Sequence, residues 1–131
     1  MSGSTENQAT IFLVEEDDET RRPLVRNLRA EGYHVIVSLD EEDAMERVGG
    51  GHVPADLILL NLTGKSTDEA LDAGRRIRVH AKYDGHTPLV VMAEKYGEDL
   101  EGTDVNAGGN DWITYPEDGD QLRNLIARLT E

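Results

Sequence analysis

The stretch Asp-Leu-Ile-Leu-Leu-Asn-Leu-Thr-Gly at residues 56–64 decides the fold. Its four consecutive aliphatic residues are typical of a strand buried on both faces, although a piece of buried helix has the same pattern. Gly64 and the polar residues 65–68 favour the short strand. Such a strand lies at the centre of a parallel sheet, and ligands bind just outside the carboxyl ends of such strands. Asn61 lies at that end, so we expect it at the centre of any site.

Composition limits the chain to one domain and argues against several functions. The 131 residues carry 27 acids and 13 bases, a net charge of −14 that disfavours a nucleic-acid surface or an anionic membrane. A basic partner stays open beside the simpler interpretation of a solvated acidic exterior. The absence of cysteine excludes disulfides, thiolate metal sites and a cysteine nucleophile. No apolar run approaches the roughly 20 residues of a membrane span, and no signal peptide precedes Thr10, so we expect a cytoplasmic protein.

Short apolar runs alternate with helical patterns along the chain. We predict strands at residues 10–14, 33–39, 57–60, 88–92 and 112–114. Helices are predicted from the acidic run 15–19 to Gly32, at 40–48, at 68–82 and at 120–129. The segment 93–110 should hold a fifth helix, but its glycines and few apolar residues predict a short or mobile one.

This alternation predicts an α/β fold, a doubly wound five-stranded parallel sheet. Residues 1–9 are expected to be a disordered leader, and residues 10–131 a single domain. The ligand crevice at the strand ends should be lined by polar and small side chains from four strands: Glu15, Glu16, Asn61, Ala93 and Tyr115.

Four motifs resemble the receiver domain of two-component response regulators, over residues 10–129. They are an apolar strand followed by acids (11–17), Asp-Leu-Ile-Leu-Leu-X-Leu (56–62), Pro-Leu-Val-Val-Met (88–92) and Gly-Gly-Asn-Asp-Trp-Ile-Thr-X-Pro (108–116). The resemblance implies a flavodoxin-like (βα)5 fold with strand order 2-1-3-4-5. The loop after Asn61 departs from the family pattern, because it lacks the usual Pro-Gly and Asp-Gly pairs.

Receivers accept a phosphoryl group on an Asp, with Mg²⁺ held by that Asp, a nearby acid and a backbone carbonyl. A Lys neutralises the phosphoryl oxygens, while a hydroxyl residue and an aromatic residue respond to the phosphate. The resemblance places these positions on Asn61 (phosphoacceptor), Glu15 and Glu16 (acids), Thr63 (carbonyl), Tyr115 (Lys), Ala93 (hydroxyl) and Trp112 (aromatic).

Three of these positions lack the chemistry that the family needs. Asn61 has a neutral amide and cannot form an acyl phosphate, Ala93 has no hydroxyl, and Tyr115 has no positive charge. The loss of the acid and the loss of the Lys compensate in charge. The usual receiver site, with three carboxylates and one Lys, has a formal charge of −2, and Glu15 and Glu16 alone also give −2. Glu15 and Glu16 also reach one methylene further than Asp, which disturbs a hard-ion site, so we expect weak or absent Mg²⁺ binding. We hypothesise that Tyr115 fills the space of the missing Lys and bonds Asn61 or a glutamate through its hydroxyl.

Simpler interpretations stand beside these. The acids at 15–19 form either a vestigial metal pocket or merely an acid-rich helix start. Trp112 is either the responsive aromatic or, as we favour, a core anchor, and the arginines at 21–29 and 75–78 are expected to be largely solvated.

We therefore predict a degenerate receiver without enzymatic activity, which acts as a phosphorylation-independent protein-interaction module in two-component signalling. The resemblance implies a partner face made by the fourth helix, fifth strand and fifth helix, here with Leu100, Val105, Trp112, Ile113 and Arg123. A homodimer stays open, and no nucleic-acid or membrane partner and no cofactor are expected. Alternatives are a small-ligand or nucleotide sensor using the crevice, a residual Mg²⁺-dependent phosphotransfer protein using Glu15, Glu16 or Asp17, and a fragment lacking its output domain.

Overall fold

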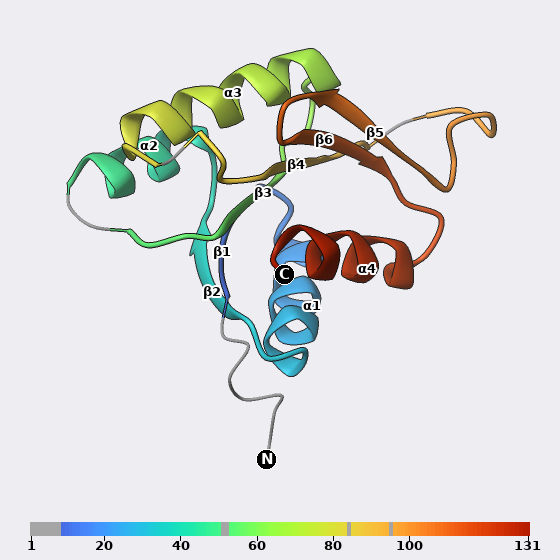
Figure 1. The fold of residues 1–131 in the computed structure, drawn as a ribbon, viewed down its shortest axis with the longest axis horizontal. Coiled ribbons are helices and arrows are strands. Elements are labelled where there is room, and N and C mark those ends of the chain that lie inside the picture. Colours follow the sequence, from blue (N-terminus) through green and yellow to red (C-terminus); the bar gives the residue numbers. More distant parts are fainter. Residues whose placement is uncertain (1–8, 51–52, 84, 95) are drawn as a thin grey trace.

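The structure, a computed structural model, describes residues 9–50, 53–83, 85–94 and 96–131 (Figure 1). Its elements follow the chain as β1 (Thr10–Glu15), α1 (Asp18–Ala30), β2 (His34–Ser38), α2 (Glu41–Gly49), β3 (Leu57–Asn61), α3 (Thr67–His80), β4 (Leu89–Met92), β5 (Thr103–Gly108), β6 (Asp111–Tyr115) and α4 (Gly119–Leu129). The strands form one sheet in the order β2-β1-β3-β4-β6-β5. Only β5 runs antiparallel to its neighbour among the described strands.

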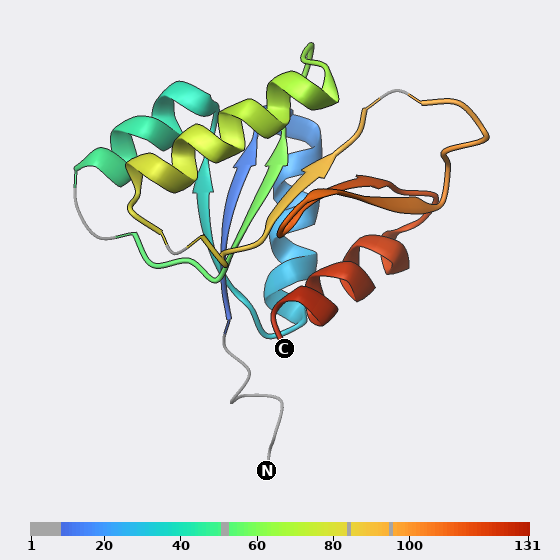
Figure 2. The ribbon, with the colours of Figure 1, turned by 45° about the horizontal axis from the view of Figure 1, so that its top comes forward.

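The apolar runs become central strands because their side chains alternate between two cores. Phe12 of β1 and Ile58 of β3 belong to the core beneath α2 and α3, whereas Ile11 and Leu57 belong to the core beneath α1 and α4. Figure 2 shows these two helix pairs on opposite faces of the sheet. Burial on both faces accounts for the uninterrupted hydrophobicity of these strands and places their carboxyl ends together at one edge.

Each helix begins at a polar residue that caps its free backbone N–H groups. Asp17, Asp40 and Asp118 accept from backbone N–H groups of the first turn, and Ser66 forms a reciprocal capping box with Glu69. The predicted cap at Asp40 is confirmed. Gly32 ends the turn after α1 with a φ of 99°, a left-handed conformation that favours glycine.

The segment expected to hold a fifth helix is different in the structure. No helix is present in residues 93–110, apart from the undescribed residue 95, and residues 103–108 instead form β5 against β6. The prediction of a helix there is therefore wrong. Gly97 and Gly102 disfavour a helix, and the positive φ angles of Gly108 (118°) and Gly109 (55°) make the tight turn of a hairpin.

Helix α3 lies very close to the sheet at Gly74. A Cβ atom at this position would lie 2.4 Å and 2.6 Å from the two Cδ atoms of Leu89. A methyl group here would force the buried side chain of Leu89 to shift, so glycine suits this close packing of α3 on the sheet.

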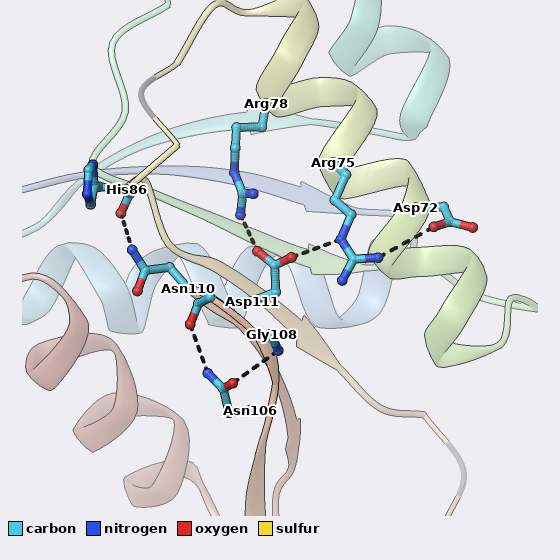
Figure 3. Close-up of polar contacts among 9 residues, drawn as sticks. Asp72, Arg75, Arg78, His86, Asn106, Gly108, Asn110 and Asp111 are labelled. Carbon is cyan, nitrogen blue, oxygen red and sulfur yellow. Dashed lines mark hydrogen bonds and ion pairs between the residues drawn. The ribbon is translucent and has the colours of Figure 1, made fainter.

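A buried carboxylate connects α3 to the start of β6 (Figure 3). Asp111 is 5% exposed and accepts from Arg75 Nε at 2.8 Å and from Arg78 Nη2. The expectation that these arginines are largely solvated is therefore wrong for Arg78, whose side chain is 15% exposed. Burial raises the pKa of Asp111, but the hydrogen bonds and charges of Arg78 and Arg75 outweigh it and hold the pKa below its usual value.

Two further expectations concern a disordered leader at residues 1–9 and the absence of a membrane span. The expected leader lies outside the described residues except for Ala9, whose carbonyl accepts from His34 N–H at 3.0 Å. Within the described ranges, no helix has the length and apolarity that crossing a membrane requires.

Candidate functional site

The centre of the candidate site is a pair of side chains at the ends of β1 and β3. The parallel register places Glu15 opposite Asn61, as the two strand ends predicted. Asn61 Nδ2 donates to both carboxylate oxygens of Glu15, at 3.0 Å and 2.9 Å. A carboxylate only accepts hydrogen bonds, so the amide must turn its nitrogen towards Glu15.

Burial dominates the electrostatics of Glu15. Its side chain is fully buried, and this desolvation raises the pKa of Glu15, against the opposing effect of the hydrogen bonds from Asn61 and the Asp17 N–H. The Asp17 N–H donates to Glu15 Oε2 at 3.1 Å. Neutral donors thus hold this buried carboxylate, and among the described residues no cationic side chain hydrogen-bonds or forms an ion pair with it, although the charge of Arg21 also acts to lower its pKa.

Glu16 belongs to the same strand end but bonds to the loop after β3. Its Oε1 accepts from the backbone N–H of Thr63 at 2.8 Å and from Thr63 Oγ1 at 3.0 Å. The Glu16 N–H also donates to the carbonyl of Asn61 at 3.2 Å. The structure therefore brings together Glu15, Glu16, Asn61 and Thr63, four of the predicted site residues.

Asp17 is committed to the start of α1. It accepts from Glu19 N–H at 3.1 Å and from Thr20 Oγ1 at 2.7 Å, and these bonds lower the pKa of Asp17. Of the two interpretations of the acidic run, the helix start describes Asp17, whereas Glu15 and Glu16 face the strand ends.

Ala93 and Tyr115 lie at the other two strand ends. Ala93 is half-buried and donates its N–H to the carbonyl of Thr114 at 2.9 Å. Tyr115 is half-buried against the core beneath α2 and α3, and its ring meets Tyr96 edge-on at 5.4 Å. Between described residues, no hydrogen bond joins the Tyr115 hydroxyl to Asn61, Glu15 or Glu16, so the bond that we hypothesised is not formed.

Trp112 packs into the core beneath α1 and α4. The guanidinium of Arg128 lies 5.4 Å from the centre of the Trp112 ring, within the range of a cation–π interaction. This position agrees with the core-anchor interpretation.

The residues expected on the partner face do not share one surface. Trp112 and Ile113 point to opposite faces of the sheet, and Ile113 is 7% exposed. Arg123 lies on α4 and pairs with Asp120 and, at 3.6 Å, with Glu31. Val105 (39% exposed) and the half-buried Leu100 remain partly accessible beside β6. The expected face fails as a unit because β5 takes the place of the helix that was to complete it.

Sequence reasoning missed several residues around the site. Arg21 donates from Nε to the carbonyl of Glu15 at 2.9 Å, and Glu94 Oε1 accepts from the N–H of Gly64 at 3.4 Å. Glu94 follows Ala93 at a strand end, and this position is a signal that could have found it. Arg21 had no comparable signal, because every residue type offers a backbone carbonyl and the identity of residue 15 therefore does not indicate this bond.

The receiver fold implies Mg²⁺ at these strand ends, but the side chains present do not fit it. Both oxygens of Glu15 accept from Asn61, one oxygen of Glu16 binds Thr63, and Asn61 offers a donor where a metal needs an acceptor. Among the residues described, no group of three His, Asp or Glu side chains is arranged to hold a metal ion. As arranged, these side chains do not present the set of oxygen ligands that Mg²⁺ requires.

Comparisons with known proteins agree with the receiver fold. No protein-family model matches the chain. The chain is 28% identical over 119 residues to the uncharacterized transcriptional regulatory protein YkoG of Bacillus subtilis, and 25% identical over 123 residues to the sensory transduction protein RegX3 of Mycobacterium bovis. These matches cover 91% and 92% of this chain and 48% of each relative, so the chain spans about half the length of the curated relatives it matches.

Solved structures give the same result for the fold. The response regulator TrrA of Thermotoga maritima in complex with Mg²⁺–BeF matches with a TM-score of 0.65 and 21% identity, over 93% of this chain and 99% of that chain. The structure of the histidine kinase ThkA in complex with TrrA matches with a TM-score of 0.67 and 20% identity, over 95% of this chain and 100% of that chain. The predicted fold class, a flavodoxin-like receiver fold, is confirmed, with β5 as an added antiparallel strand.

Proposed function

We propose that this receiver-fold domain acts in two-component-type signal transduction as a protein-interaction module that does not depend on phosphorylation. The observation that carries the proposal is the amide of Asn61 bonded to both oxygens of the buried Glu15. This arrangement offers a hydrogen-bond donor at the position where a receiver offers a nucleophile.

The neighbouring strand ends support the same proposal. A phosphoryl group needs cationic or hydroxyl groups around its oxygens, and here Ala93 offers a methyl group and Tyr115 an aromatic ring packed on Tyr96. Glu15 and Glu16 would repel an incoming phosphoryl group. We therefore propose that the domain is no enzyme and takes no cofactor at this edge.

The partner in this proposal is a protein. TrrA, a structural neighbour, is known in complex with the histidine kinase ThkA, which supports a protein partner for this domain. The accessible apolar residues beside β6, Val105 and Leu100, make the proposed contact surface, and a second copy of this chain is the alternative occupant. The net charge of −14 supports a partner that is neither nucleic acid nor an anionic membrane.

An amide NMR titration with Mg²⁺ and beryllofluoride, a phosphoryl mimic, tests the proposal. The unmodified protein should show no saturable shifts at Asn61, Thr63 or Ala93. The triple variant Asn61→Asp, Ala93→Thr, Tyr115→Lys is the positive control, because it returns the missing groups to the same scaffold. Saturable shifts centred on these three residues in the unmodified protein would disprove the proposal.

A further inference from the structure

A groove runs between α1 and β2, at the end of the sheet away from β5. It is lined by two valines, four arginines and one aspartate: Val25, Val37, Arg21, Arg22, Arg26, Arg29 and Asp18. Both valines are half-buried and pack at the edge of the core beneath α1 and α4. The groove thus has an apolar floor, with four guanidinium groups and the Asp18 carboxylate, which is paired with Arg21, around it.

Two of the four arginines are committed to the fold. Arg21 donates to the carbonyl of Glu15 at 2.9 Å and pairs with Asp18 at 2.7 Å. Arg29 Nη2 donates to the carbonyl of Val35 at 3.3 Å, which connects α1 to β2. These bonds hold the walls of the groove in place.

The other two arginines have no such partner. Arg22 and Arg26 are exposed, and neither forms an ion pair or hydrogen bond with any residue that the structure describes. They lie four residues apart and so point from the same face of α1 at successive turns. Guanidinium groups placed in this way can each take a carboxylate in a two-pronged hydrogen bond.

This positive patch is unusual in an acidic chain. Four of the 13 basic residues lie within residues 21–29, although the net charge is −14. Acids border the patch along α1: Asp18, which lines the groove and is paired with Arg21, and Glu19 lie at its start, and Glu31 lies just beyond its end. Arg22 to Arg29 span only about 10 Å of helix axis. An acidic peptide longer than a few residues would therefore extend past the patch and be repelled by the neighbouring acids.

We propose that the groove binds a short acidic segment of a partner protein, with its carboxylates on Arg22 and Arg26 and an apolar side chain on Val25 and Val37. The short patch and the acidic surroundings disfavour a nucleic acid, which needs an extended basic track. The apolar floor disfavours free phosphate, which has no group to place there. The site lies far along the sheet from Val105 and does not depend on the proposed function.

Fluorescence anisotropy with the full chain and a labelled probe peptide tests this proposal. The probe is an amidated helical peptide with glutamates at successive turns and leucines beside them, and the matched control peptide has glutamines instead. We expect the double variant Arg22→Gln, Arg26→Gln to bind the probe at least about tenfold more weakly, since it loses two hydrogen bonds between charged groups. The control variant Arg47→Gln removes an exposed arginine of α2 and should leave the affinity unchanged.

Amide NMR shifts on adding the probe should fall on residues 21–29 and 35–38, and urea unfolding should show that both variants are as stable as the unmodified protein. Absence of binding at millimolar probe would overturn the proposal. Equal binding of the glutamine peptide, or equal weakening by Arg47→Gln, would do the same. Binding of a single-stranded oligonucleotide or of inorganic phosphate more tightly than the probe peptide would overturn the proposal and assign the groove to that ligand instead.

Discussion

The substitution Asn61→Asp probes the bond at the centre of the site. It exchanges the amide nitrogen, 2.9 Å and 3.0 Å from the two oxygens of Glu15, for a carboxylate oxygen. The lost hydrogen bonds to a charged acceptor are worth about 1.5–3 kcal/mol. Two carboxylates about 4 Å apart at an effective dielectric constant of about 20 repel by about 4 kcal/mol, unless the pair takes up a proton. We therefore expect the free energy of unfolding to fall by about 3 kcal/mol at pH 7, because proton uptake relieves part of the sum.

The pH dependence gives this prediction its sign. The folded Asp–Glu pair binds a proton more tightly than the same residues do in the unfolded chain, so its pKa is raised. Relative to the unmodified protein, the variant is therefore least destabilised at low pH, and its relative stability falls as pH rises, by up to about 1.4 kcal/mol per pH unit. Added Mg²⁺ should stabilise the variant, since it binds carboxylate oxygens, and should leave the unmodified protein unchanged.

Urea unfolding followed by circular dichroism between pH 5 and 8, with and without Mg²⁺, measures these effects. Asn124→Asp is the matched control, because it adds the same charge on the exposed side of α4 and should change stability by less than about 0.5 kcal/mol. An Asn61→Asp variant as stable as the unmodified protein at pH 7, with no added slope in pH, would refute the contact between Asn61 and Glu15. Equal stabilisation of both proteins by Mg²⁺ would refute the conclusion that the site does not fit the metal.

Three further predictions follow from the buried groups. Asp111→Asn should lower the free energy of unfolding by about 3 kcal/mol, since it leaves Arg78 without its charged partner. The variant should also lose less stability than the unmodified protein as pH falls below the usual aspartate pKa of 3.8, because it lacks the carboxylate whose folded-state pKa is lowered. Acid unfolding and urea unfolding measure the two effects. Gly74→Ala should destabilise by about 1–3 kcal/mol despite the better helix propensity of alanine, because its methyl group would overlap Leu89; an equal or higher melting temperature would contradict this packing. NMR titration of the Glu15 carboxyl should give a pKa above the usual 4.5, because burial disfavours its charged form. Protonated Glu15 then stabilises the folded state at low pH, and this stabilisation is lost as pH rises through the folded-state pKa. A pKa below 4.5 would contradict the burial of the group.

The parallel core was predictable because its signals are local. Continuous apolar runs fixed the central strands, and the shared edge of those strands put Glu15 opposite Asn61. The hairpin of β5 and β6 was not predictable in the same way. Its signals, Gly108 and Gly109, interrupt a helical pattern and begin the receiver-like motif at 108–116, but paired glycines also mark a tight turn between strands.

Pairings between distant side chains were equally hidden. Asp111 and Arg75 are separated by 36 positions, and arginines on a helix look the same whether they face water or a buried carboxylate. The hydroxyl contact expected of Tyr115 failed for a related reason, since Tyr96 offered its ring another neighbour. Residue types at strand ends are readable from the sequence, whereas the partners of long side chains depend on the packing around them.

The charges at the strand ends support the expectation that Asn61→Asp and Tyr115→Lys are better tolerated together than singly. Glu15 and Glu16 alone give a formal charge of −2, Asn61→Asp makes it −3, and adding Tyr115→Lys returns it to −2. A carboxylate introduced alone meets the buried Glu15, with which no cationic side chain of the described residues pairs, while a lysine introduced alone finds Asn61 rather than a third acid. The amide of Asn61 satisfies the buried carboxylate of Glu15 without a metal or a lysine, because it supplies donors and no charge. The bond from Asn61 to Glu15 is thus a structural arrangement in its own right, and we expect Asn61→Asp introduced alone to lower stability.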